Sequence, residues 1–180
     1  MNKIQEYLLQ KRIARALKKN SARRVTLNFK DARRIGILFL IQQEGQHQAM
    51  NRFVDVLKKE GKMMEAMTWF SQAHGSPYNF PYNFFTEKDI DATGKLKSQE
   101  VDRFIEQPFD YLYCICNQRH LVFDYILAKS QAKCRIGKHA PDSEKFFELM
   151  VTGKDNEPED HLMQNMLHYT QAIANNTGLL

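Results

Sequence analysis

Apolar and polar residues along this chain fall into blocks that predict strands and helices in turn. The run Ile35–Ile41 is continuously apolar with polar residues on both sides, which is typical of a parallel strand covered on both faces. Farther along, Met50, Phe53 and Leu57 follow the spacing of a helix that ends at Gly61. On the same grounds, strands are predicted at 35–41, 63–71, near 84, 110–117 and 132–140, and helices at 4–19, 45–61, 99–109, 119–131, 143–151 and from 157 onward.

Two of these helices carry start signals of their own. Asp142 or Ser143 is a suitable N-cap for a helix that continues to about Val151. Pro158 and the acidic residues around it suit the start of the last helix, because proline fits the first turn and carboxylates are favoured there. The apolar stripe of that last helix extends to Ile173.

The order of these elements predicts a single α/β domain. Twice a strand is followed by a helix and another strand with short links, and this pattern produces right-handed parallel crossovers. A chain of 180 residues suffices for one compact domain with a substantial core. We therefore expect a three-layer, Rossmann-like or flavodoxin-like domain with a mostly parallel sheet over 31–180, preceded by a basic N-terminal helical arm over 1–30.

Charge is distributed unevenly between these two parts. The net charge is +5, but residues 1–34 carry +9 and residues 35–180 carry −4. The stretch QKRIARALKKNSARR contains seven basic residues and no acidic one. Basicity therefore belongs to the arm, and a polyanionic partner is the functional interpretation that we favour, beside a basic helix that simply packs on its own domain.

The predicted helix of the arm has two different sides. On one side the cations would contact phosphates of RNA, a ribosomal surface or another polyanion, with salt-sensitive binding and little sequence selectivity. On the other side Leu9, Ile13 and Leu17 would allow docking to an anionic membrane surface or a protein partner, or simple packing on the domain itself. The anion-binding candidates are Lys11, Arg12, Arg15, Lys18, Lys19, Arg23 and Arg24.

Ligands of open parallel sheets bind outside the carboxyl ends of the strands, so the residues that follow each predicted strand form the second candidate site. The polar residues at these positions are Glu44, His47, Asn117, Arg119, His120, Lys138 and His139. They could surround one ligand mouth, for example for a nucleotide or sugar nucleotide.

Several absences argue against catalysis at that mouth. The turn after the first strand has one glycine, Gly45, in place of a phosphate-binding glycine motif. The nucleophile elbow G-x-S-x-G and the zinc motif H-E-x-x-H do not occur, and the histidines lack ligand spacing. We therefore predict no catalytic residues, no metal and no cofactor. A binding module is favoured over an enzyme.

Two further features have simple interpretations. Cys114, Cys116 and Cys134 are odd in number and form no second pair, so they are predicted to be buried free thiols.

The tandem unit PYNF over 77–84 offers aromatic rings for a ligand platform or, more simply, for fixing a long loop to the body. The sequence lacks a signal peptide and a membrane span, so a cytoplasmic location is expected.

Three strings resemble an uncharacterised family of small proteins from Bacteroidetes bacteria. They are ARRIGILFLI, FFTEKDIDATGKLKSQEVDRFIEQPFDYLYCICNQ and AKCRIGKHA, and the resemblance covers roughly 30–173. It implies an α/β fold and a bacterial source but no activity. Phe109, Asp110 and the run 132–137 are also faintly similar to the amino-terminal half of heptosyltransferase-type glycosyltransferases, whose second domain, the main sugar-nucleotide site, this chain lacks.

Overall fold

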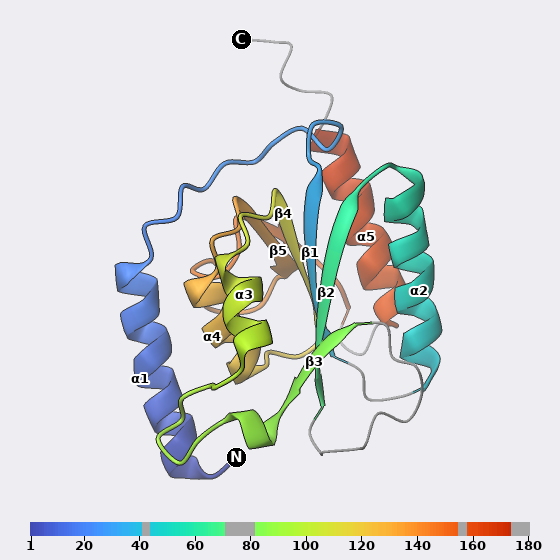
Figure 1. Cartoon of the computed structure of the whole chain (residues 1–180). Coiled ribbons are helices and arrows are strands. Elements are labelled where there is room, and N and C mark those ends of the chain that lie inside the picture. Colours follow the sequence, from blue (N-terminus) through green and yellow to red (C-terminus); the bar gives the residue numbers. More distant parts are fainter. Residues whose placement is uncertain (41–43, 71–81, 155–157, 174–180) are drawn as a thin grey trace.

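A six-stranded, all-parallel sheet forms the centre of the computed structural model (Figure 1). The model describes residues 1–40, 44–70, 82–154 and 158–173, with the backbone alone at 44 and 45. The strands are β1 (Arg34–Leu40), β2 (Met63–Phe70), β3 (Asn83–Thr86), β4 (Tyr111–Ile115), β5 (Cys134–Lys138) and β6 (Leu149–Val151). Their order across the sheet is β3-β2-β1-β4-β5-β6, which is the Rossmann order, so the Rossmann-like alternative is confirmed over the flavodoxin-like one.

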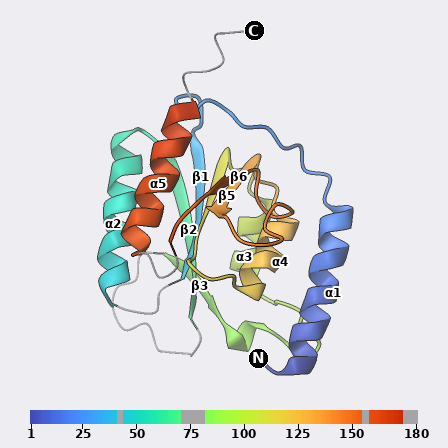
Figure 2. The ribbon, with the colours of Figure 1, turned by 180° about the vertical axis from the view of Figure 1, so that it is seen from behind.

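Helices cover both faces of this sheet. They are α1 (Lys3–Lys19), α2 (Glu44–Lys59), α3 (Gln99–Glu106), α4 (Leu121–Lys129) and α5 (Glu159–Ala172), with a short 3-10 turn η1 (Glu87–Asp89) after β3. Figures 1 and 2 show α2 and α5 on one face and α3 and α4 on the other, with α1 outside α4. The expected three layers are present, and α1 adds a partial fourth.

Side chains alternate along the strands and so divide the core into two parts. On β1, Ile35, Ile37 and Phe39 face α2 and α5, whereas Leu38 faces α3 and α4. Gly36 lies on the α3 and α4 side, where a Cβ atom would approach the ring of Phe109 to 2.6 Å. Glycine is therefore required at this position in the strand.

The basic helix α1 packs on the domain. Asn2 and Gln5 form a reciprocal capping box at its start. Leu9 and Ile13 are 1% and 5% exposed and join the core that surrounds α4. In consequence the arm is not a protruding appendage: its apolar side, which the sequence left open for a membrane or partner, is occupied by α4.

The helix predicted for 143–151 is wrong, because this segment forms turns and then strand β6. The Ser143 hydroxyl accepts a hydrogen bond from the Ala140 amide, and Asp142 has a positive φ of 60°. Phe147 covers Gly137 on β5, and the amide of Glu148 donates to the carbonyl of Arg135. These contacts with β5 direct the chain along the sheet edge instead of into a helix.

The aromatic unit PYNF is described only in part, since Tyr78 and Phe80 lie outside the described residues. Tyr82 packs edge-on against Phe39 at 5.7 Å and donates a hydrogen bond to Asn51 at 2.7 Å. These contacts agree with rings that fix the loop to the body.

Candidate functional site

The carboxyl ends of β4 and β5 surround a small inner cavity of about 50 Å³. Four of the seven residues predicted for the ligand mouth line it, namely Asn117, Arg119, His120 and Lys138. The other three do not join them. His47 lies on α2 and His139 is exposed, and neither lines this cavity, while the side chain of Glu44 lies outside the described residues.

An ion pair stands at the entrance of the cavity, at the start of α4. The Nε of Arg119 donates to Oδ2 of Asp124 at 2.6 Å. Burial raises the pKa of Asp124, whereas the hydrogen bond from Arg119 acts in the opposite direction. Asp124 is buried while the Arg119 side chain is 45% exposed, so the carboxylate fixes a guanidinium that remains open to solvent.

His120 is the N-cap residue of α4 and is held between two aromatic rings. Its ring centroid lies 5.3 Å from that of Trp69 and 4.8 Å from that of Phe123. Burial lowers its pKa, so the imidazole is neutral near pH 7. Its Nδ1 is enclosed and has no hydrogen-bond partner within the described part of the chain.

The cysteines are free, as expected, and are poor nucleophiles. Cys114 and Cys134 are buried, and Cys116 is partly buried. Burial raises the pKa of Cys114 well above its ordinary value and that of Cys116 to about 11, so both thiols are protonated at neutral pH. Among the residues that the structure describes, no group of three or more His, Cys, Asp or Glu side chains could hold a metal ion.

The seven basic residues of the arm divide into two groups. Arg12 donates to the backbone and hydroxyl of Thr93, and Arg24 donates to the carbonyls of Ala132 and Ser130. The other five are exposed and make no hydrogen bond or ion pair with any described residue: Lys11, Arg15, Lys18, Lys19 and Arg23. We name these five residues the basic face.

A shallow groove of about 350 Å³ lies beside the basic face, between the carboxyl-terminal halves of α1 and α4. Arg12, Arg15, Lys19 and Lys129 line it, together with the uncharged Ala16, Asn20, Tyr125 and Gln131. No carboxylate is among these lining residues. Lys129 lies 3.7 Å from Asp102, whereas the other three cations of the groove make no ion pair with a described residue. Lys129 could not be associated with the arm from the sequence, because the packing of α1 against α4 is visible only in the structure.

The motifs that make the sequence distinctive have structural roles. Asp110, from PFD, accepts hydrogen bonds from the amides of Arg33 and Arg34 and from Lys133 Nζ. Arg135, from AKCRIG, pairs with Glu148 at 2.6 Å. These contacts join the amino ends of the strands. The cavity lies at the carboxyl ends, on the opposite side of the sheet.

The sequence matches the model of a family of unknown function (DUF6913) over residues 5–173. The chain belongs to this family. The DUF6913 match includes nearly all of α1, whereas the sequence resemblance began only near residue 30. A comparison with curated proteins found no similar sequence.

None of the helices in the described part of the chain has both the length and the apolarity needed to cross a bilayer. The DUF6913 description assigns no activity, so the function has to be argued from the geometry of the two sites.

Proposed function

We propose that this protein binds a polyanion, with the RNA backbone as the best fit, through the basic face and the groove beside it. The supporting observation is that five cations of one helix and its exit are exposed without an internal acidic partner among the described residues. Cations arranged in this way neutralise phosphates and release counterions, which drives association.

The dimensions of α1 suit a phosphate backbone. Lys11 and Lys19 are separated by eight residues, or about 12 Å of helix at 1.5 Å per residue. Along the axis of a DNA duplex, that length corresponds to roughly three or four phosphates of one strand, at 3.4 Å each. Tyr7 is the exposed aromatic residue of α1, and Lys11 Nζ lies 4.5 Å from its ring centroid. One ring offers little base stacking, so contacts to the backbone dominate and sequence selectivity is low.

The two alternatives from the sequence have less support. Membrane or partner docking through Leu9, Ile13 and Leu17 requires a side of α1 that packs against α4. A nucleotide or sugar nucleotide at the strand ends requires a pocket of several hundred Å³, whereas the inner cavity measures about 50 Å³. An interaction through the outward side of α1 needs neither the apolar side that packs against α4 nor a large pocket at the strand ends.

The test is a titration of fluorescently labelled oligouridine with two variants of equal charge. One variant replaces the five residues of the basic face with Gln. The control replaces five exposed lysines elsewhere with Gln: Lys30, Lys58, Lys59, Lys88 and Lys95. Substitution is preferable to deletion of α1, because deletion would expose the apolar residues of α4.

We expect the basic-face variant to bind at least about tenfold more weakly than wild type and the control to stay within about threefold. Equal losses in the two variants would show that only net charge matters, and absence of binding by wild type would refute the proposal. Circular dichroism of each variant verifies that the fold is retained.

A further inference from the structure

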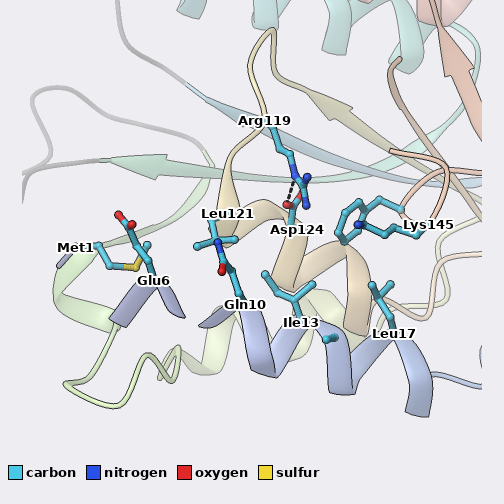
Figure 3. Close-up of a pocket in the computed structure, with 11 residues that line it drawn as sticks. Met1, Glu6, Gln10, Ile13, Leu17, Arg119, Leu121, Asp124 and Lys145 are labelled. Carbon is cyan, nitrogen blue, oxygen red and sulfur yellow. Dashed lines mark hydrogen bonds and ion pairs between the residues drawn. The ribbon is translucent and has the colours of Figure 1, made fainter. Parts of the chain in front are cut away.

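A second and larger groove opens along another side of α1. It has a volume of about 550 Å³ and runs between α1, the start of α4 and the loop before β6 (Figure 3). Leu17 and Leu121 are partly buried and line the groove, and the side chains of Ile13 and Phe146, which are 5% and 1% exposed, lie beneath them. The volume is in the range of small-molecule sites.

Two cations meet at one end of this groove. The Cζ of Arg119 lies 5.2 Å from the ring centroid of Phe146, and the Nζ of Lys145 lies 5.6 Å from the same centroid. Arg119 binds Asp124 through Nε only, so its two Nη groups are without a partner among the described residues. The terminal fork of a guanidinium matches the two oxygens of a carboxylate.

The charge at this end is not balanced by the protein. Lys145 makes no ion pair with a described residue, and Asp124 is the carboxylate that lines the groove at this end. The other acidic residue of the lining, Glu6, lies at the opposite end of the groove (Figure 3). One positive charge therefore remains beside these apolar side chains.

The inner cavity adds a polar group behind this end. It shares Arg119, Asp124 and Phe146 with the groove, so the two spaces adjoin. His120 lines the inner cavity and carries the enclosed Nδ1 described above.

We propose that the groove binds a small organic acid with an apolar body. The carboxylate lies against the Nη groups of Arg119 and the ammonium of Lys145, and the apolar body lies along Leu17 and Leu121. Asp124 acts as a positioning residue, because its bond to Nε fixes the plane of the guanidinium. None of these residues belongs to the basic face, so this site is independent of the polyanion proposal.

The test is calorimetric titration of the full chain with decanoate, at concentrations below those at which it forms micelles. Decanol, which has the same chain without the charge, serves as the ligand control. Saturable decanoate binding is expected, with decanol at least about tenfold weaker because it leaves the two cations without an anion. Equal affinity for both ligands, or no decanoate binding, would overturn the proposal.

Three variants locate the site on the protein. Lys145→Gln removes one cation, Arg119→Lys keeps the charge but removes the fork, and Ala14→Trp fills the groove from its exposed wall. Each is expected to weaken decanoate binding about tenfold. Their controls, Lys58→Gln and Ala172→Trp, are on α2 and α5 and should bind as wild type does. Wild-type affinity in Ala14→Trp and Lys145→Gln would place decanoate elsewhere and contradict the assignment.

Discussion

At the residue scale, Asp110 shows why distinctive sequence motifs need not mark a functional site. Its carboxylate accepts three hydrogen bonds of 2.7–2.9 Å, from the amides of Arg33 and Arg34 and from Lys133 Nζ. Burial alone would raise its pKa, but these hydrogen bonds outweigh burial and lower it. The carboxylate thereby joins the starts of β1 and β4 to the residue that precedes β5.

Replacing this carboxylate should destabilise the protein in a pH-dependent way. Asp110→Asn is expected to lower the free energy of unfolding by about 3 kcal/mol at pH 7. Because the folded-state pKa is lowered, the stabilisation is present above the unfolded-state pKa of about 4 and is lost as pH falls through the folded-state value. Urea unfolding at pH 7 and below pH 4 measures this difference, which should shrink in acid. Asp55→Asn, at an exposed position, is the control, and an equal effect of both substitutions would contradict this role for Asp110.

A glycine that supports α1 offers a second prediction at this scale. Gly94 has a φ of 67°, and a Cβ atom there would lie 2.8 Å from the backbone oxygen of Gln5. Gly61 has a φ of 71° but an added Cβ would have no neighbour within 4 Å. Gly61→Ala should therefore cost only the left-handed penalty of about 1 kcal/mol, and Gly94→Ala about 1 kcal/mol more. Equal unfolding free energies for the two variants would indicate that the loop at Gly94 does not support α1.

At the element scale, the contact between α1 and α4 explains why α4 is buried on every side and why α1 has an apolar side. Residues 122–128 of α4 are all buried, because the sheet lies on one side of the helix and α1 on the other. A helix that is apolar on every side requires such cover. The sequence LVFDYILA carries this pattern, but it was interpreted only as a helix, and the buried ion pair of Asp124 was not predicted.

A pair of substitutions on α1 tests whether this helix is part of the cooperative domain. Leu9→Ala, at a 1% exposed position, should reduce the free energy of unfolding by about 3 kcal/mol. Ile4→Ala, at a 69% exposed position of the same helix, should change it by less than about 0.5 kcal/mol. Chemical denaturation followed by circular dichroism provides both values. A small effect of Leu9→Ala would mean that α1 detaches without unfolding the domain.

Elements with strong local patterns could be predicted from the sequence, and elements that depend on distant contacts could not. The apolar runs of β1 and β4 and the helical spacing in α2 were sufficient to predict these three elements. Burial on both faces of a strand, or along one stripe of a helix, leaves a direct pattern of apolar residues in the sequence. The segment 143–151 has a helix-like start, yet Glu148 and Phe147 contact β5 and produce β6. Lys145 was consequently not associated with Arg119, which was one of the residues predicted for the ligand mouth.

At the scale of the whole molecule, the charge distribution has a consequence for association. Residues 1–34 carry +9 and the remainder −4, and four of the exposed cations of this segment, Lys11, Arg15, Lys18 and Lys19, lie on α1. Figure 1 shows α1 as the outermost element on its side of the sheet. If a polyanion is the partner, as proposed, this charge distribution would attract it to α1 and repel it from the acidic body, and so would orient the encounter.

The most direct test of this account is the salt dependence of RNA binding. The logarithm of the association constant for oligouridine should fall linearly with the logarithm of the salt concentration, with a slope of roughly −0.7 for each phosphate contacted. Replacing the five cations of the basic face with Gln should make that slope less steep by about 3, whereas the five-lysine control should leave it unchanged within about 1. An identical slope in wild type and the basic-face variant would contradict the account, because phosphates would then be contacted elsewhere or not at all.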